Sequence, residues 1–370
     1  MEYVFTLFLI FYTFYLIFLL FNIFGLLINK KKSTSHPETL SASIIIAIRN
    51  GQNSVNKIIQ DLLNQDYRGI FEIILVDDQS SDKTKEIIQN AEKKSNKIKY
   101  VSSKSGDSNL KFKKRALDAG IKFSNNEILV FTDVDCRLSP SWLSSILSEF
   151  TEKVDYVIGF SRAKQRFGFA NLFQRVDFLI LMFSALAVTR LGFPLACSGQ
   201  NQAYRRSLFL KVGGYDSISQ LLMGDDSIFL QKCLKKKIGV KFCEHPQSYV
   251  FCRSEEKWRD LFFQRMRWAG DGNIMWRYNF FFYTIMLATA LSNFFILFLI
   301  LNNFWTTLFF IIISKFIVEL ILTILGSYKF KETISILSFI YWFSLNIPYV
   351  CIMTIASFFT PFLSWKNRTQ

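Results

Sequence analysis

The sequence is poor in the residues that build most protein metal centres. It has 2 histidines, and its 6 cysteines show no C-x-x-C pair and no zinc-like spacing. This scarcity argues against a His/Cys metal site, so any bound metal ion must be held by carboxylates. Cysteines scattered in this way fit a reducing compartment, where thiols stay free. No G-x-G-x-x-G follows any predicted strand, which disfavours a dinucleotide-binding site.

Acidic residues are also in deficit, because 44 Lys and Arg stand against 29 Asp and Glu, a formal charge of +15. Such a charge could indicate a nucleic-acid binder, but no recognisable nucleic-acid motif accompanies it, so we expect no nucleic-acid partner. In a membrane protein, Lys and Arg favour the cytosolic face and the anionic lipid surface. The 51% hydrophobic content and 41 Phe, concentrated at the two ends of the chain, support that alternative.

The N-terminal residues 3–28 form an almost uninterrupted apolar run, which Lys30, Lys31 and Lys32 follow. About 20 apolar residues suffice to cross a bilayer as a helix. The run lacks the basic start and the cleavage site of a signal peptide, so we predict an uncleaved anchor over 1–29. The lysine cluster predicts that the next domain lies in the cytosol. We therefore expect a multi-pass protein of the cell (inner) membrane that contacts membrane lipids.

Three further apolar runs, over 281–301, 304–325 and 333–359, predict about three membrane helices in the C-terminal region 278–361. The last run contains Pro348, which predicts a kinked or re-entrant segment. Within the second run, Lys315 and Glu319 stand four residues apart, so they can pair on one helix face. We expect this pair to be structural rather than part of a transport path.

A shorter apolar stretch, 178–188, is interrupted on both sides by charged residues and is too short to span. An interfacial helix that guides a lipid-borne ligand and a core helix both fit this stretch, and we favour the interfacial helix.

The middle of the chain, 40–277, alternates apolar strands with helical stretches. Strands are predicted at 43–48, 71–77, 98–101 and 127–132. This alternation predicts an α/β fold with a mostly parallel sheet flanked by helices. In such sheets ligands bind beyond the carboxyl ends of the strands. Polar residues stand at those ends: Arg49, then Asp77 and Asp78, then Asp133 and Asp135.

Asp133 and Asp135 follow an apolar strand and flank one residue. In an extended segment the two carboxylates would project to the same side and could share one cation. Mg²⁺ or Mn²⁺ suits one or two carboxylates, with phosphates and water completing the shell. The alternative is ordinary turn chemistry before Pro140. For Asp77 and Asp78 we favour nucleoside recognition over a second metal site.

Two later motifs carry further candidates. Asp225 and Asp226 follow Gly224 in a polar break, where a carboxylate could accept the proton of an attacking hydroxyl. The alternative is an acidic helix start, to which we give equal weight. Gln264, Arg267 and Trp268 lie within one helical turn; Arg suits phosphate, and Trp offers a face for a sugar ring. Interfacial anchoring is the alternative for this last set.

Six segments of the chain resemble, in the same order, those of the membrane-bound family 2 glycosyltransferases, such as cellulose and hyaluronan synthases and ceramide glucosyltransferases. These segments are RN, VDDQSSD, TDVDC, SGQNQAYRR, GDD and QRMRW. The resemblance implies a GT-A fold and inverting, metal-dependent transfer from a nucleotide-sugar donor, an EC 2.4 activity. It implies Asp226 as the general base and Asp133 and Asp135 as ligands of Mg²⁺ or Mn²⁺. The resemblance also implies that the donor nucleotide is bound by Arg49, Asp77, Asp78, Lys114 and Asp133. It implies that the acceptor and the diphosphate are bound by Gly199, Asn201, Asp225, Gln264, Arg267 and Trp268.

The expected function is therefore transfer of a sugar to a lipid-linked or membrane-associated acceptor at the cytosolic membrane face. A processive polysaccharide synthase that extrudes its product is the alternative within the same enzyme class. Such synthases tend to carry more membrane helices than the four predicted for this chain. A non-enzymatic membrane scaffold or transporter is a distant alternative, since the acidic residues cluster in the soluble part.

Overall fold

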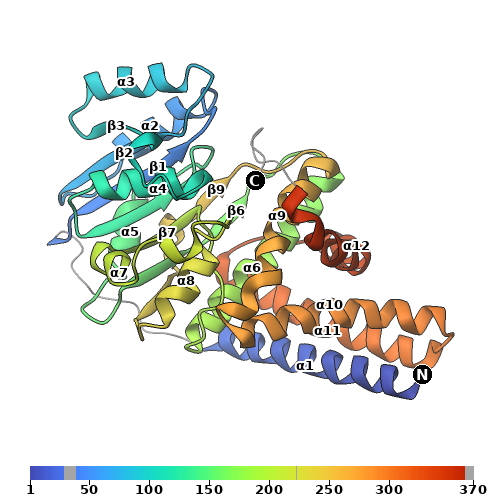
Figure 1. Cartoon of the computed structure of the whole chain (residues 1–370). Helices are drawn as coiled ribbons and strands as arrows, with labels where there is room; N and C mark the ends of the chain where they lie inside the picture. Colours follow the sequence, from blue (N-terminus) through green and yellow to red (C-terminus); the bar gives the residue numbers. More distant parts are fainter. Residues whose placement is uncertain (29–38, 222, 363–370) are drawn as a thin grey trace. The chain divides into compact units, whose positions relative to one another are not determined.

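The computed structural model describes residues 1–28, 39–221 and 223–362, which form two compact units (Figure 1). The sheet unit comprises Lys31–Lys164 and Pro194–Arg253, and the helical unit comprises Met1–Lys30, Gln165–Phe193 and Ser254–Gln370. Residues 165–193 and 254–277 thus group with the apolar helices. The boundaries expected at 1–29, 40–277 and 278–361 stay predictions, and the Lys30 to Lys32 cluster lies outside the described residues.

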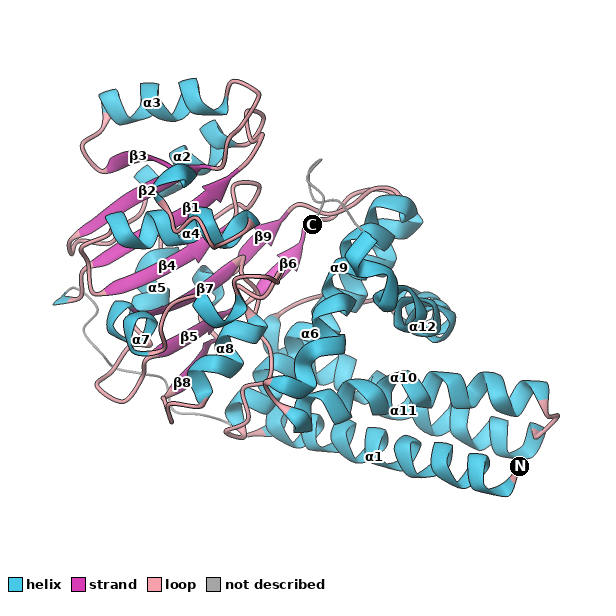
Figure 2. Ribbon diagram, viewed as in Figure 1, coloured by secondary structure: helices cyan, strands magenta, loops and turns pink. Residues whose placement is uncertain are grey.

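The sheet unit contains two sheets covered by short helices (Figure 2). Its strands are β1 (Ala42–Ile48), β2 (Phe71–Asp77), β3 (Ile98–Ser102), β4 (Ile128–Thr132), β5 (Tyr156–Gly159), β6 (Ser161–Ala163), β7 (Asn201–Arg205), β8 (Val240–Cys243) and β9 (Val250–Cys252). Its α-helices are α2 (Val55–Leu63), α3 (Thr84–Lys94), α4 (Phe112–Phe123), α5 (Trp142–Leu147), α7 (Arg206–Lys211) and α8 (Ser227–Leu234).

Seven strands form the main sheet in the order β3-β2-β1-β4-β7-β5-β8, and β6 pairs with β9. Strands β1 to β4 are parallel, and β7 runs antiparallel to both of its neighbours, β4 and β5. The expected mostly parallel sheet flanked by helices is confirmed, with β7 as the strand that reverses direction.

Both faces of the sheet are buried, which explains why its first strands are continuous apolar runs. One face packs against α2, α3 and α5 in a single apolar core. The other face meets α4, where a Cβ on Gly120 would lie 2.6 Å from Ile45 and 2.9 Å from Val76. The helix can approach this closely because glycine has no side chain.

The strand register brings the predicted polar residues to one edge. Ile48 of β1 pairs with Asp77 of β2, which pairs with Ser102 of β3. On the other side, β1 runs parallel to β4, and Thr132 of β4 pairs with Asn201 of β7. The residues that follow β1, β2 and β4 therefore share the carboxyl edge of the sheet.

The helical unit holds α1 (Glu2–Leu27), α6 (Phe169–Arg190), α9 (Trp258–Ile274), α10 (Phe280–Leu301), α11 (Trp305–Phe330) and α12 (Ile336–Ala356). Helices α1, α10, α11 and α12 are long and apolar enough to cross a membrane, which agrees with the predicted one N-terminal and three C-terminal spans. Asn303, with φ 59°, lies in the tight link between α10 and α11. Pro348 lies inside α12.

The expectation for 178–188 needs correction. The helix there is α6, which runs for 22 residues through the flanking charges and is also long and apolar enough to span. It packs closely against two helices of its unit. A Cβ on Gly25 of α1 would lie 2.4 Å from the Ala187 carbonyl oxygen, and a Cβ on Gly326 of α11 would lie 2.1 Å from the Phe183 ring, so glycine allows both approaches. Because 72% of the most apolar stretch of α6 is buried, a core helix describes α6 better than an interfacial helix does.

The charged pair on α11 is buried as expected. Lys315 and Glu319 form an ion pair with 0% and 2% exposure. The Tyr15 hydroxyl of α1 donates a hydrogen bond to the Glu319 carboxylate, so the pair also ties α1 to α11. Hydrogen bonds of this kind are a common way of joining helices that lie in lipid.

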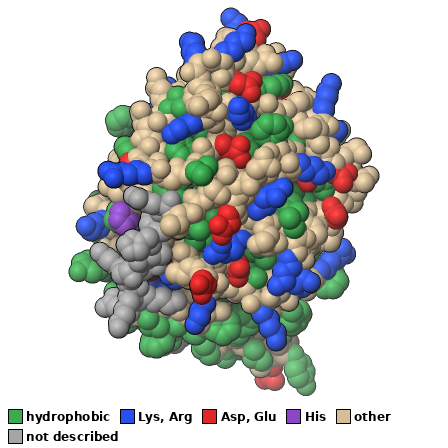
Figure 3. Space-filling model, turned by 90° about the vertical axis from the view of Figure 1, so that its left-hand side faces the viewer, with side chains coloured by type: hydrophobic (Ala, Val, Ile, Leu, Met, Phe, Trp, Pro, Cys, Tyr) green, Lys and Arg blue, Asp and Glu red, His purple; other side chains and the backbone are tan. Residues whose placement is uncertain are grey.

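Surface charge is mixed on the face that Figure 3 shows, where Lys and Arg side chains alternate with Asp and Glu across the coloured residues. On this face the Lys and Arg side chains are scattered and do not form one stripe.

Candidate active site

The turn after β2 is held by polar contacts at the carboxyl edge of the sheet. Asp77 and Asp78 are 5% and 3% exposed. The Asp77 carboxylate accepts a hydrogen bond from the Ser80 backbone at 3.2 Å. Arg49 donates to the carbonyl oxygens of Asp78 and Gln79 at 2.9 and 3.1 Å. The three predicted nucleotide-binding residues Arg49, Asp77 and Asp78 thus come together, in a turn whose backbone Arg49 fixes.

Asp133 and Asp135 follow β4 in a turn rather than in an extended segment, closed by a hydrogen bond from the Cys136 backbone to the Asp133 carbonyl at 3.2 Å. The expectation that an extended segment projects both carboxylates to the same side therefore does not apply here. Both residues are partly exposed, with 28% of the Asp133 side chain open to solvent.

Lys113 connects two of the predicted acidic motifs. Its ammonium lies 3.0 Å from the Asp133 carboxylate and 3.1 Å from the Asp225 carboxylate. The lysine comes from the first turn of α4, and its side chain is 22% exposed. Sequence reasoning missed this residue and chose its neighbour, Lys114. A lysine-rich helix start was visible in the sequence, but the lysine that faces the carboxylates depends on how α4 docks on the sheet.

Asp226 is the N-cap residue of α8 and also faces the segment before β7. One carboxylate oxygen accepts from the Ser227 backbone at 2.5 Å, and the other accepts from the Gly199 backbone at 3.3 Å. The helix-start interpretation is therefore correct, and it leaves the carboxylate partly exposed beside Asp225. Capping and a chemical role are compatible, because a carboxylate has more acceptor sites than these two bonds use.

The local charges push the pKa values of the two adjacent aspartates apart. Burial acts to raise the pKa of Asp225, but Lys113 and Lys114 outweigh it and hold that pKa below its usual value. Burial and the negative charge of Asp225 raise the pKa of Asp226 to about 6. Burial would lower the pKa of Lys113, yet Asp133 and Asp225 hold it well above its usual value. Paired titratable groups with separated pKa values are typical of acid–base sites.

Gly199 lies directly over this cluster. A Cβ there would stand 3.3 Å from both the Asp225 carboxylate and the Lys113 ammonium. The segment is anchored by Ser227, whose hydroxyl exchanges hydrogen bonds with the Cys197 backbone at 3.1 and 3.2 Å. A side chain at this position would therefore crowd Asp225 and Lys113, and glycine lets the segment pass this close to them.

Two predicted site residues have their polar atoms elsewhere. Lys114 is 1% exposed, and its ammonium donates to the carbonyl oxygens of Leu221 and Met223, the latter at 2.8 Å. It therefore holds the loop before Asp225, and from there its charge acts on the Asp225 carboxylate.

Asn201 is 0% exposed. Its amide donates to the carbonyl oxygens of Phe160 and Ser248 at 2.9 and 2.8 Å. Its oxygen accepts from the Trp142 indole at 3.0 Å. These three bonds make Asn201 a support of the sheet rather than a residue that faces a ligand.

Gln264, Arg267 and Trp268 lie on α9, in the helical unit. Gln264 exchanges hydrogen bonds with neighbouring side chains of its own unit. The Nε of Arg267 is buried and has no hydrogen-bond partner among the described residues, and burial lowers the pKa of its guanidinium although Glu255 opposes this. Trp268 packs against Phe178, with ring centroids 5.8 Å apart.

The carboxylates that follow β4 have the chemistry of a hard-cation site. Asp133 and Asp135 supply only oxygen ligands and are both partly exposed, which suits Mg²⁺ or Mn²⁺. In the part of the chain that the structure describes, no three His, Cys, Asp or Glu side chains gather into a complete ligand set. Two carboxylates would leave coordination positions open for phosphate and water. The residues therefore fit a metal ion whose coordination shell is completed by the phosphates of a substrate.

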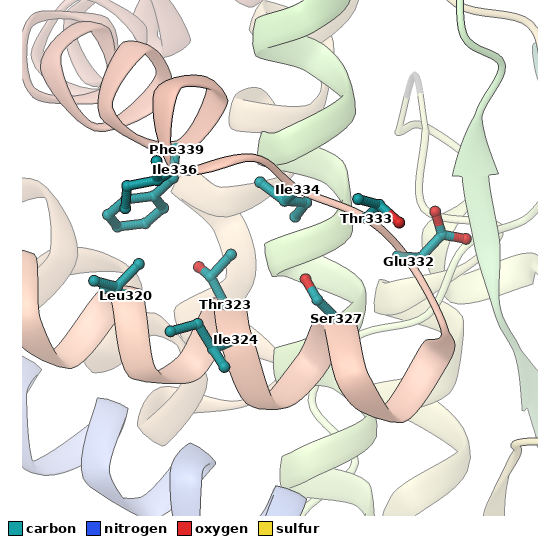
Figure 4. Close-up of a pocket in the computed structure, with 9 residues that line it drawn as sticks. All are labelled: Leu320, Thr323, Ile324, Ser327, Glu332, Thr333, Ile334, Ile336 and Phe339. Atoms are coloured by element: carbon teal, nitrogen blue, oxygen red, sulfur yellow. The ribbon is translucent and has the colours of Figure 1, made fainter.

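A separate cavity of about 310 Å³ lies in the helical unit between α11 and α12 (Figure 4). Its walls are mostly apolar, and Glu332 is its one carboxylate. The cavity therefore lacks the paired acidic groups of the sheet unit.

Residues 43–213 match the family described as Glycosyl transferase family 2. The chain is 26% identical over 238 residues to a probable glycosyltransferase of Bacillus subtilis, an alignment that covers 63% of this chain and 55% of that protein. It is 32% identical over 120 residues to a GalNAc(5)-diNAcBac-PP-undecaprenol beta-1,3-glucosyltransferase of Campylobacter jejuni, covering 32% and 37%. The chain thus spans little more than half, or less, of these two curated relatives.

Among solved structures, a mannosyltransferase from Pyrobaculum calidifontis, in complex with GDP-Man and Mn²⁺, matches with a TM-score of 0.61 and 14% identity over 99% of both chains. The fold is therefore that of the GT-A glycosyltransferases. Residues 43–213 are thus similar to family 2 glycosyltransferases in sequence, and the chain is similar to a glycosyltransferase in fold. The resemblance seen in the ordered sequence motifs is confirmed.

Proposed function

We propose that the chain is an inverting glycosyltransferase that moves a sugar from a nucleotide-sugar donor to a lipid-linked or membrane-associated acceptor at the cytosolic membrane face. The observation that carries the proposal is the cluster of Lys113, Asp133, Asp225 and Asp226 at one edge of the sheet. It combines a candidate cation site with a carboxylate whose pKa, about 6, suits a general base near neutral pH.

The donor is assigned to the carboxyl edge of β1, β2 and β4. Asp77 and Asp78, with Arg49, would contact the nucleoside. Asp133 and Asp135 would hold Mg²⁺ or Mn²⁺, which supplies charge stabilisation for a leaving nucleoside diphosphate when bound. Mn²⁺ accompanies GDP-Man in the mannosyltransferase of similar fold, which supports a divalent ion here.

Asp226 is assigned to the acceptor side. Its partly exposed carboxylate would take the proton of the attacking hydroxyl, and inversion follows from a single displacement at the anomeric carbon. The Gly199 backbone N–H orients that carboxylate, and Lys113 neutralises the neighbouring Asp225, so that a second charge does not face the acceptor.

A lipid acceptor is supported by the apolar helices and by the relatives. The Campylobacter protein is named for an undecaprenol-linked acceptor, and a Trichormus variabilis relative, 26% identical over 62% of this chain and 48% of that protein, is a beta-monoglucosyldiacylglycerol synthase. The helices that are long and apolar enough to cross a membrane would keep the protein at the lipid surface where such an acceptor is found.

The test is a panel of nucleotide sugars offered to the purified protein in lipid nanodiscs made with a bacterial lipid extract. We expect one donor to release nucleoside diphosphate with Mg²⁺ or Mn²⁺ but not with EDTA, and to label one lipid. The labelled product should carry the anomeric configuration opposite to that of the donor. Absence of release from every donor would refute the proposal, and a polymer on a sizing gel would replace it with the processive synthase.

A further inference from the structure

Helix α6 presents two buried polar side chains to α9. Gln174 and Asp177, three residues apart and thus on one side of the helix, are 4% and 7% exposed. Asp177 forms an ion pair with Arg265 at 2.9 Å, and Gln174 donates to the Gln264 amide oxygen at 3.1 Å. Two consecutive residues of the Q-x-x-R-W segment are therefore held by one face of α6.

The ion pair continues to the tryptophan of that segment. The Arg265 guanidinium lies 4.2 Å from the centre of the Trp268 ring, which is cation–π geometry. Phe178, the residue after Asp177, packs against the same indole with ring centroids 5.8 Å apart. The orientation of Trp268 thus depends on a guanidinium that Asp177 fixes.

A second set of contacts surrounds the glutamine. The Glu255 backbone N–H donates to the Gln174 oxygen at 2.8 Å, and Gln264 donates to the Glu255 carboxylate at 3.4 Å. With the bond from Gln174 to Gln264, three hydrogen bonds close a ring. The Glu255 charge also acts on Arg267. Gln264, Arg267 and Trp268, the members of the predicted acceptor and diphosphate set that lie on α9, are thus each in contact with this network or in its field.

Net stability is a poor explanation for the ion pair. Asp177 and Arg265 are 7% and 4% exposed, and removing both charges from water costs about as much as their attraction returns. An apolar pair of similar size would stabilise the helices at least equally well. The ion pair instead fixes the orientation of its side chains. The Trp342 indole donates a hydrogen bond to one Asp177 oxygen at 3.4 Å, while the Arg265 guanidinium forms the ion pair with the other oxygen.

We infer that Asp177, together with Gln174, is a positioning residue that sets Gln264 and Trp268 in their working orientation through direct contact with Gln264 and Arg265. This inference rests on the proposed function, because a working role for Gln264 and Trp268, the grip on acceptor and diphosphate that the resemblance to family 2 glycosyltransferases implies, exists only in such a transferase. In this role Asp177 acts through Arg265 and does not itself contact a substrate.

The experiment compares Asp177→Asn with a matched control, Glu319→Gln. Each change keeps the size of the side chain and leaves one buried cation, Arg265 or Lys315, without its carboxylate, so both should lower the melting temperature. We expect Asp177→Asn to lower kcat/KM at least ten-fold, and Asp177→Glu to recover part of it. Glu319→Gln should stay within two-fold of the native protein, since its ion pair lies apart from the segment.

A second readout does not depend on turnover. The difference in fluorescence between each protein and its Trp268→Phe partner isolates the emission of that one indole. We expect Asp177→Asn to shift this emission and Glu319→Gln to leave it as in the native protein. Equal emission and equal kcat/KM in the two variants would overturn the inference. A native protein that transfers no sugar would instead refute the proposed function, and the fluorescence comparison would still decide the positioning.

Discussion

Replacing Asp226 by Asn should stabilise the protein while it removes a proposed catalytic group. Burial and Asp225 raise the pKa of Asp226 from 3.8 to about 6, so folding disfavours its ionised form. A raised pKa contributes stability that is fully present below pH 3.8 and is lost as the pH rises through about 6. At pH 8 the ionised carboxylate therefore lowers the free energy of unfolding, and the neutral amide does not.

The size of the effect follows from the same pKa. The pKa of Asp226 differs by about 2 units between the folded and the unfolded protein. At about 1.4 kcal/mol for each unit, the free energy of unfolding changes by at most about 3 kcal/mol. For a domain of this size that corresponds to a rise in melting temperature of about 6 to 12 °C. Asn can keep one hydrogen bond of the helix cap, because it is as good an N-cap residue as Asp.

The assay is thermal unfolding of the native protein and the Asn variant from pH 4 to 8, with metal chelated. The gain should be largest at pH 8, shrink through pH 6 and vanish near pH 4. Asp225→Asn is the matched control with the opposite sign: its lowered pKa means that its stabilisation is present above pH 3.8 and is lost as the pH falls further. A gain that does not change with pH, or a loss at pH 8, would refute the reasoning.

Three other predictions follow from the cluster. The rate of transfer should rise with pH through about 6 as Asp226 loses its proton, as a kcat profile from pH 5 to 8 would show; a flat profile would contradict this. Gly199→Ala should lower kcat at least ten-fold with little change in melting temperature, because its Cβ would stand 3.3 Å from Asp225 and Lys113; full activity would mean that the space is not used. Asn201→Ala should cost about 2 to 5 kcal/mol in a denaturation experiment and leave the donor KM of the folded protein unchanged, since its amide serves buried groups; a raised KM with native stability would return it to the binding site.

The sheet and its polar edge could be predicted from the sequence because they depend on local patterns. Strands buried on both faces are continuous apolar runs, and parallel strands bring their carboxyl ends to one edge. Asp77 and Asp133 each follow such a run directly, so their meeting at one edge required only the topology. The membrane-length helices at the two ends of the chain were equally visible, since composition and length define them, whereas the charged residues beside 178–188 hid the full length of α6.

The residues that were misplaced depend on packing that no local pattern records. Lys113 and Lys114 are neighbours about 100° apart on a helix, and only the docking of α4 decides which one faces the carboxylates. Asn201 is a polar residue in a strand covered on both faces, so its burial follows from the neighbouring strands. The packing of α6 rests on Gly25 and Gly326, which lie far from it in the sequence.

The account depends most directly on Asp226 as the base of a glycosyl transfer. The decisive measurement compares donor binding and sugar transfer for the native protein and Asp226→Asn, with the donor and metal ion that the nucleotide-sugar panel identifies. We predict a nucleotide-sugar Kd within three-fold of native and a transfer rate at least a hundred-fold lower, in line with the loss of a general base. Transfer at the native rate by the Asn variant would contradict the account.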